Sequence, residues 1–537
     1  MDAPTSLRRL VQTGAGVGAV GLGCLIADRG GQFDRPIAVA CGAAGFAGVT
    51  HAALRRTANR AAAPTAHGPL DRVLLSWDAD NPLTVRDLLA GGVAVFGRTG
   101  SGKTSSSGKA IARAAVGLPG SGGLILAAKP EDRAMWEGIF RAAGRADDLL
   151  AFGPDEPLRF NFIDAEMAAG GHTRNIVRCI TTIGETLRAS NNTGGENADF
   201  WEAEQARMLH AAVEVVKLAY GKVAAPDLQK FISGAAQSAE ALKSDAWQKG
   251  YHAQTVQRAS DRAKSPLEQH DFDLAVDYWI GEFPVMADRT RSSITTGVFG
   301  ILHVFNSGIV RELVSTTTNV SPDDLFRGKW ILVNTPPSDL GDVGHFVAAG
   351  WKYLVQRAVL RREATDGSNV VVCWADEAQQ FVNSHDAVFI AQCRSHRGCL
   401  VYLTQSLASY YSALHGDRGR HQADALLTNF NLKIFHAIGD PQTAHWAASL
   451  VGKSLQTFVG GSVQPAQSFY DQLLKPGQYT GSFSQHYEQV LQDNVFLNGL
   501  RTGGPHNGLL CDCVVVRSGE PFADGRNHLF ATFSQRD

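Results

Sequence analysis

The chain has 537 residues, of which 44% are hydrophobic and 19% charged, and its formal net charge is −2. Its length is enough for about three domains, and its hydrophobic content excludes a disordered protein. Because the chain is not basic overall, any nucleic acid must be bound by a local patch or a pore lining.

Two segments near the N-terminus have the length and composition of membrane-spanning helices. Residues 10–27 and 36–54 contain no Asp, Glu, Lys or Arg, and each is just long enough as a helix to cross about 30 Å of hydrocarbon. Arginines flank the pair on both outer sides, which predicts that both ends face the cytoplasm. We therefore expect residues 1–56 to form a hairpin in the inner membrane, with the bulk of this multi-pass chain cytoplasmic. A cleaved signal peptide would leave the second segment unexplained.

After an Ala/Pro/Gly linker at residues 57–69, the pattern becomes globular. Short apolar runs predict buried strands at 93–96, 123–128, 329–334, 369–374, 400–404 and 432–438. Residues 165–321 lack long β-branched runs and instead show helical periodicity, at 200–220, 226–242 and 292–305. We predict an α/β fold with a parallel sheet: a nucleotide-binding domain in two parts, 70–164 and 322–537 with the C-terminal tail, interrupted by an all-α insertion domain at 165–321.

The first strand leads into a phosphate-loop pattern of Gly, four residues, then Gly-Lys-Thr. Its residues are Gly97, Arg98, Thr99, Gly100, Ser101, Gly102, Lys103 and Thr104. The glycines let backbone N–H groups turn toward a polyphosphate. Lys103 supplies a point charge for the β- and γ-phosphates, and Thr104 offers a hydroxyl to Mg²⁺ at the start of a helix predicted over 105–116. This strand, loop and helix predict a site for ATP and Mg²⁺.

The strand at 369–374 is followed by two carboxylates, Asp376 and Glu377. Asp376 can reach Mg²⁺ through water, and Glu377 can orient and polarise the attacking water. The next strand ends at Gln405, which can sense the γ-phosphate or that water; a solvated strand-end amide is the alternative. We therefore expect Glu377 and Gln405 to take part in catalysis.

Two arginines, Arg394 and Arg397, lie between these strands. From a helix end or loop, one of them can face the next subunit of a ring and stabilise the charge that builds on the γ-phosphate. We prefer Arg394 as this catalytic residue and expect it at the sheet edge that bears the active site. A role as surface solubilisers is the alternative.

Several stretches of the second half resemble the type IV secretion coupling proteins, the VirD4/TraG/TraD group. They are Ala-Asp-Glu-Ala-Gln at 375–379, Arg-Ser-His-Arg-Gly at 394–398, Tyr-Leu-Thr-Gln-Ser at 402–406, Thr-Asn-Phe-Asn-Leu-Lys-Ile-Phe at 428–435 and Gly-Asp-Pro-Gln-Thr-Ala at 439–444. The resemblance also includes the N-terminal hairpin, the phosphate loop and Asp-Phe-Trp at 199–201. It covers most of the chain in the right order, although the tail from about residue 460 matches only weakly.

The resemblance implies a membrane-anchored, homo-hexameric, RecA-like P-loop ATPase. Such proteins bring DNA, expected here to be single-stranded and attached to a relaxase, to the components of a type IV secretion channel used in conjugation. The helical insert then corresponds to the family's all-α domain, which is associated with substrate recognition. Ala128 stands where the family often has an acidic residue before its Lys, a departure that concerns specialised contacts and not the ATPase core.

Other functions remain open at this point. An FtsK/HerA-type translocase of double-stranded DNA and a protein-exporting secretion ATPase share the same ATPase motifs, whereas the membrane hairpin joined to a helical insert favours a coupling protein. Glu377 argues against a nucleotide-binding scaffold without turnover. In the tail, residues 500–505 form either a turn near the nucleotide base or, as we expect, a plain loop, and Cys511 and Cys513 are expected to be small apolar fillers on one strand face.

Overall fold

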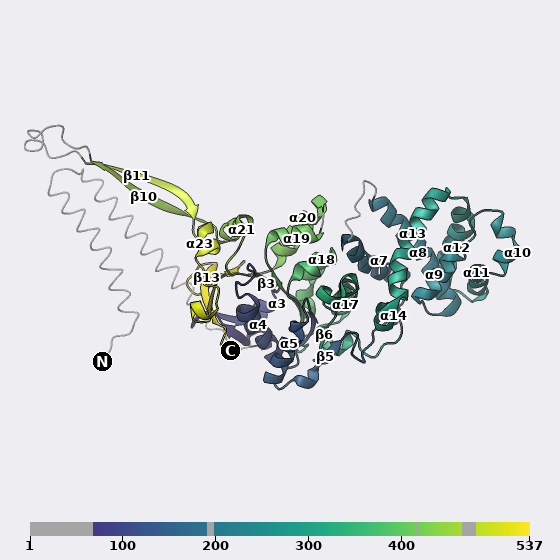
Figure 1. Ribbon diagram of the computed structural model, residues 1–537, viewed down its shortest axis with the longest axis horizontal. Coiled ribbons are helices and arrows are strands. Elements are labelled where there is room, and N and C mark those ends of the chain that lie inside the picture. Colours follow the sequence, from purple (N-terminus) through teal and green to yellow (C-terminus); the bar gives the residue numbers. More distant parts are fainter. Residues whose placement is uncertain (1–67, 191–197, 415, 464–478, 537) are drawn as a thin grey trace, which may run out of the picture. The chain divides into compact units, whose positions relative to one another are not determined.

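The computed structural model describes residues 68–190, 198–414, 416–463 and 479–536. By internal contacts the chain divides into Met1–Gly68 and Pro69–Asp537, and the second unit holds the fold described below (Figure 1). The membrane segments predicted at 10–27 and 36–54 lie outside the described residues. Among the described residues no single helix is long and apolar enough to cross a membrane, although the bent pair α13 (Asp288–Asn306) and α14 (Gly308–Val314) together meets that test by length and composition.

The unit is built on a nine-stranded sheet with the strand order β13-β12-β9-β3-β8-β7-β4-β6-β5. The strands are β3 (Val93–Phe96), β4 (Gly122–Leu126), β5 (Leu149–Phe152), β6 (Trp330–Val333), β7 (Val371–Ala375), β8 (Gly398–Thr404), β9 (Leu432–Phe435), β12 (Leu510–Arg517) and β13 (His528–Ser534). From β9 to β5 all neighbours are parallel. The prediction of a parallel sheet is therefore confirmed for this part, whereas β12 and β13 add an antiparallel edge that was not predicted.

The central strands are buried on both faces, which explains why they are continuous apolar runs in the sequence. In β3, Val93 and Val95 belong to one core cluster, and Ala94 and Phe96 belong to the other. The first cluster is covered by the helices α3 (Val85–Leu89), α4 (Lys109–Gly117) and α5 (Glu131–Ala142). The opposite face is covered by α17 (Asp342–Arg361), α18 (His385–Gln392), α19 (Leu407–Leu414), α20 (Gly416–Asn429) and α21 (Pro441–Val451).

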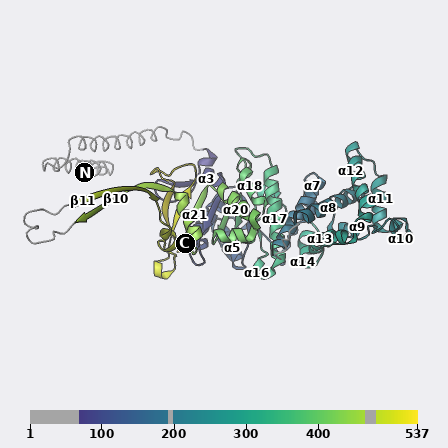
Figure 2. The same cartoon turned by 90° about the horizontal axis from the view of Figure 1, so that it is seen from above.

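Between β5 and β6 the described elements are all helical. The longer ones are α6 (Phe162–Ala168), α7 (Thr173–Ser190), α8 (Ala198–Tyr220), α9 (Ala225–Ser233), α11 (Tyr251–Asp261), α12 (Pro266–Val276), α13 and α14. The helix predicted at 226–242 is shorter than expected, because α9 ends at Ser233 and Gly234 follows it. Helix α7 packs against α17, so the helical segment joins the same core cluster as that face of the sheet (Figures 1 and 2).

Two antiparallel pairs lie outside the main sheet, and the sequence analysis missed both. Strands β1 (Val73–Ser76) and β2 (Pro82–Thr84) form a short pair near the start of the unit. Strands β10 (Lys453–Val463) and β11 (Tyr479–Gln489) form a long ribbon, and Figure 2 shows them running side by side. The last described α-helix, α23 (Asp493–Asn498), follows this ribbon and packs against α21.

Candidate nucleotide site at the carboxyl ends of the strands

The predicted phosphate loop, residues 97–104, leaves the carboxyl end of β3 between the ends of β8 and β9. The Gly97 amide donates to the Thr404 carbonyl at 3.2 Å, and the Arg98 amide donates to the Ala437 carbonyl at 2.9 Å. Gly102 has a φ of +85°, and a Cβ there would lie 2.3 Å from Sγ of Cys511. Glycine is therefore required at this position by both backbone conformation and space.

The helix after the loop begins with a π-helical turn at Thr104–Gly108 and continues as α4. A buried histidine that the sequence analysis missed braces this turn: Nε2 of His436 lies 2.7 Å from Oγ of Ser107, and its Nδ1 lies 3.1 Å from the carbonyl oxygen of Asp512. Burial lowers the pKa of His436 to about 4, so the imidazole is neutral at pH 7. Because a neutral imidazole bonded to a carbonyl must donate through Nδ1, Nε2 accepts the Ser107 hydroxyl.

Lys103 and Glu377 meet at the centre of the site. Nζ of Lys103 lies 3.2 Å from Oε1 of Glu377, and both side chains are buried. Nζ of Lys129, at the end of β4, lies 3.7 Å from the same oxygen. Gln379 and Gln405 donate to the other oxygen, Oε2, at 2.9 and 3.2 Å. The carboxylate therefore has four polar side chains around it, drawn from the ends of β3, β4, β7 and β8.

These partners keep Glu377 ionised. Burial by itself would raise the pKa of Glu377, but the hydrogen bond from Gln379 and the charge of Lys103 outweigh it and hold the pKa below its usual value. The backbone of Glu377 is in the left-handed region, with φ 48° and ψ 50°. Such a conformation is costly for a residue with a Cβ and persists where the surrounding structure enforces it.

Thr104 and Asp376, the predicted magnesium ligands, are in direct contact. The Thr104 hydroxyl donates to Oδ2 of Asp376 at 2.7 Å, and Oδ1 of Asp376 accepts the Glu377 amide at 2.8 Å. Hydroxyl and carboxylate oxygens are the ligands that Mg²⁺ takes, usually few in number and completed by water and phosphate. The buried hydroxyl of Ser101 lacks a hydrogen-bond partner among the described residues, and a Cβ at Gly100 would meet open space. This cradle fits a polyphosphate with its metal ion.

The C-terminal segment also borders the phosphate loop. Nε2 of Gln535 donates to Oγ of Ser105 at 2.6 Å, and Oε1 of Gln535 accepts the Gly504 amide at 2.8 Å. Gln535 thus links the 500–505 loop to the residue that follows the phosphate loop. Cys511 and Cys513 lie buried on β12, as expected for fillers. No local sequence pattern predicts the contacts of Gln535, because they depend on how β12 and β13 pair at the antiparallel edge of the sheet.

Arg394 lies at the opposite edge of the sheet from the phosphate loop, so the edge predicted for it is wrong. It belongs to the short 3₁₀ helix Cys393–His396, which precedes the amino end of β8, whereas the loop lies at the carboxyl ends. Strand β8 has seven residues, about 20 Å at roughly 3.3 Å per residue. A residue that precedes a parallel strand lies at the amino edge of the sheet, whereas the phosphate loop follows a strand and lies at the carboxyl edge.

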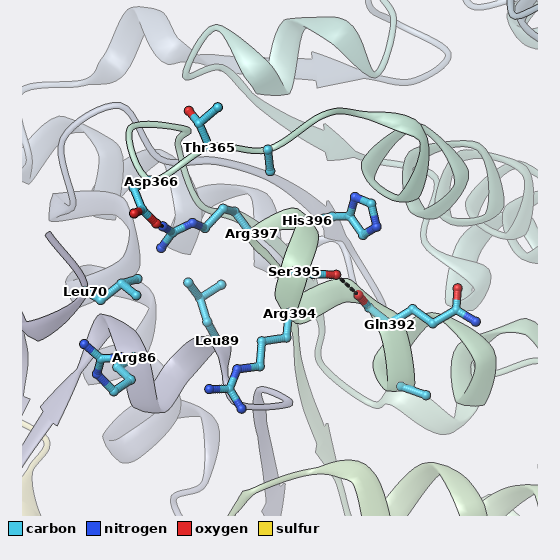
Figure 3. Close-up of a pocket in the computed structure, with 12 residues that line it drawn as sticks. Leu70, Arg86, Leu89, Thr365, Asp366, Gln392, Arg394, Ser395, His396 and Arg397 are labelled. Atoms are coloured by element: carbon cyan, nitrogen blue, oxygen red, sulfur yellow. Dashed lines mark hydrogen bonds and ion pairs between the residues drawn. The ribbon is translucent and has the colours of Figure 1, made fainter.

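Arg394 is exposed at a cavity of about 900 Å³, which Figure 3 shows with its lining side chains. Arg397 turns instead to Asp366, 2.6 Å away, and is buried with a left-handed backbone. Arg86 also lines the cavity and pairs with Asp71 at 2.8 Å. Arg394 differs from these two arginines, because no ion pair is found for it within the described part of the chain.

A family model and several solved structures are similar to this chain. Residues 370–486 match a family model described as the TraM recognition site of TraD and TraG. No curated protein matches the chain. The unbound monoclinic form of the bacterial conjugative coupling protein TrwB matches with a TM-score of 0.54 and 14% identity, over 88% of this chain and 91% of that one.

Ligand-bound forms of TrwB match equally well. The complex with the non-hydrolysable GTP analogue GDPNP and the complex with ADP and Mg²⁺ each give a TM-score of 0.54 and 14% identity, over 88% of this chain and 92% of TrwB. At this identity the structural likeness shows the fold. The family match is confined to residues 370–486, and the solved structures show that the chain shares the fold of TrwB.

Proposed function

We propose that the chain hydrolyses ATP with Mg²⁺ and uses the energy to move DNA toward a type IV secretion channel in conjugation. The observation that carries the proposal is the pairing of the phosphate loop with the end of β7, through Lys103 with Glu377 and Thr104 with Asp376. These are the side chains that phosphoryl transfer needs, held within hydrogen-bond distance of one another. TrwB has been solved with an ATP analogue and with ADP and Mg²⁺, which supports the same ligands here.

Each side chain then has a distinct task. Thr104 and Asp376 would hold Mg²⁺, which when bound neutralises charge on the phosphates. The loop amides and Lys103 bind the phosphate oxygens, and the phosphates compete with Glu377 for Lys103. Glu377, ionised and fixed by Gln379 and Gln405, accepts a hydrogen bond from the attacking water and aligns it with the γ-phosphate.

Arg394 can take part in catalysis only if the subunits assemble into a ring. The arginine lies about the length of β8 away from the site of its own subunit, so it can act only on the nucleotide of a neighbour. We propose a homo-hexamer in which Arg394 approaches the γ-phosphate next door, with single-stranded DNA in or near the central pore. The exposure of Arg394 at an open cavity supports this role.

The helical insert between β5 and β6 is proposed to choose the cargo, a relaxase attached to the DNA. It lies in sequence between parts of the sheet but contributes none of the side chains around Glu377. Exchanging it for the insert of a relative should change which substrate is transferred and leave basal ATP hydrolysis largely intact. The N-terminal segments are proposed to anchor the protein in the inner membrane.

The proposal is tested by measuring ATP hydrolysis by the full-length chain with no DNA, with single-stranded DNA and with double-stranded DNA. We expect hydrolysis that single-stranded DNA stimulates most. Stimulation by duplex DNA alone would favour an FtsK/HerA-type translocase, and hydrolysis insensitive to DNA would favour a protein-exporting ATPase. A chain with Lys103→Ala should be inactive in every arm.

A further inference from the structure

A fully buried ion pair lies behind the loop that follows Glu377. Nζ of Lys352, in the middle of α17, lies 2.6 Å from Oδ2 of Asp386, near the start of α18, and neither side chain is exposed to solvent. Gln356 and Tyr402 donate to Oδ1 of Asp386 at 2.7 and 2.9 Å. The free energy needed to remove two such charges from water is about as large as the free energy gained from their attraction. Stability alone therefore does not explain why the pair lies in the core.

The pair binds the backbone of the loop that leads away from Glu377. Lys352 also donates to the Phe381 carbonyl, and Asp386 accepts the Asn383 amide at 2.9 Å. Two turns earlier in α17, Nδ1 of His345 lies 3.0 Å from the Gln380 carbonyl oxygen. The Gln380 amide in turn donates to the carbonyl of Glu377 itself at 2.9 Å. Helix α17 therefore holds the loop at successive points, starting three residues after Glu377.

Glu377 needs such support because its backbone is left-handed. A glutamate with φ 48° is held there by its surroundings and would relax if the following residues were free to move. Relaxation would turn the carboxylate away from Lys103 and Gln405. An error of about 1 Å in the position of a reacting group can lower turnover roughly 10²-fold.

Helix α17 is itself fixed on its other side by the helical insert. Glu166 of α6 pairs with two arginines of α17, with Arg357 at 3.0 Å and with Arg361 at 2.5 Å. Phe346 packs edge-on against Phe305 of α13, with ring centroids 4.7 Å apart. Both views show α17 between α18 and α7 (Figures 1 and 2). The helix is thus anchored on the side away from the nucleotide site and can serve as a fixed reference for the loop.

We propose that Lys352 and Asp386 are positioning residues for Glu377, which fix the loop at 380–386 to α17 and so hold the carboxylate in place for water activation. This inference rests on the proposed ATP hydrolysis. It differs from a purely structural role in what it predicts: without the pair, the protein stays folded and binds nucleotide, but Glu377 is misplaced and turnover falls.

The test replaces the pair by neutral residues of similar size, Lys352→Met with Asp386→Asn, in the full-length chain. Removing both charges leaves no uncompensated ion in the core, and the asparagine can still accept from Tyr402. We expect thermal unfolding close to that of wild type, affinity for a fluorescent ATP analogue within about threefold, and kcat lowered at least about tenfold. Amide hydrogen exchange in peptides covering 377–383 should become faster. The matched control changes another ion pair, Glu214→Gln with Lys217→Met in α8, and should leave kcat and this exchange unchanged.

His345→Leu gives a milder variant, since it removes one bond to the loop and leaves the buried pair intact. It should lower kcat without weakening nucleotide binding and should also speed exchange at 377–383. Wild-type kcat and wild-type exchange in these variants would overturn the inference. If the wild-type chain itself fails to hydrolyse ATP, the proposed function fails, and the exchange measurement still decides whether the pair holds the loop.

Discussion

Lys103 and Glu377 are 274 residues apart in the chain, yet their charged groups lie 3.2 Å apart with both side chains buried. The parallel sheet produces this contact, because β3 and β7 flank β8 and all three end at the same edge. Lys103 follows one of these ends and Glu377 follows another. In the proposed function, the pair joins phosphate binding to water activation in one site.

The glycine at position 102 should resist substitution. Gly102→Ala places a Cβ against Cys511 and forces a positive φ on alanine, which costs roughly 1–2 kcal/mol from the backbone alone. Equilibrium unfolding and nucleotide binding should both weaken. Adding Cys511→Ala should restore the stability lost through the clash with Cys511. The stability lost through the positive φ should stay lost. Gly117→Ala, where a Cβ meets nothing within 4 Å, is the control and should be neutral; a Gly102→Ala chain as stable as this control would contradict the packing.

Arg394 should act in trans. Arg394→Ala should bind ATP nearly normally but hydrolyse it about 10³-fold more slowly, since such an arginine contributes mainly in the transition state. Mixing these subunits equally with Lys103→Ala subunits creates intact interfaces at about a quarter of the positions in a random ring. Partial recovery of ATP hydrolysis is expected on mixing. No recovery in rings shown to contain both subunits would rule the role out, because β8 separates Arg394 from the site of its own subunit.

Stability should fall as the pH drops from 7 to 5. Burial lowers the pKa of His252, His385 and His436 to about 4 in each case, whereas the unfolded chain binds these protons near pH 6.5. The folded state therefore keeps its full stability above about pH 6.5 and loses it progressively toward pH 4, at about 2 kcal/mol for each histidine by pH 5. Denaturant unfolding of residues 69–537 at both pH values checks the slope. His252→Asn should reduce the loss of stability between pH 7 and 5 by the contribution of one histidine. An unchanged dependence of stability on pH would mean that the pKa of His252 is not lowered in the folded state.

The N-terminal hairpin is predicted from composition alone. Full-length protein should fractionate with membranes, and a chain that starts at Pro69, where the second compact unit begins, should be largely soluble. A reporter placed at Gly30, between the two uncharged segments, should read as external. A reporter that stays cytoplasmic would show that the topology is wrong.

Much of the sheet could be predicted because β3, β7 and β8 are buried on both faces and therefore read as apolar runs. The meeting of the phosphate loop with Asp376 and Glu377 follows from strand polarity. The same rule, applied to Arg394, would have placed it at the amino edge. Strand β5 is only partly buried along most of its length and carries a weak signal. The contacts of His436 and Gln535 depend on how β12 and β13 pair antiparallel at the edge of the sheet. No local sequence pattern predicts that pairing.

The support for Glu377 could not be read from sequence for a similar reason. Lys352 lies in an apolar helix and Asp386 near the start of another, and each looks like an isolated charge in the chain. Only the packing of α17 against α18 shows that the two charges pair and hold the loop between them. A charged residue within an apolar helix indicates that a residue of opposite charge lies nearby in the fold, but it does not identify that residue.

The most direct test of the central claim compares nucleotide binding and turnover in Glu377→Gln and Lys103→Ala chains. Lys103→Ala should lose most affinity for ATP, because the phosphates lose their charge partner. Glu377→Gln should bind ATP as wild type does and hydrolyse it orders of magnitude more slowly, since the carboxylate acts mainly in the transition state. Near-normal hydrolysis by Glu377→Gln would contradict the account, because it would remove from catalysis the residue on which Lys103, Gln379 and Gln405 converge.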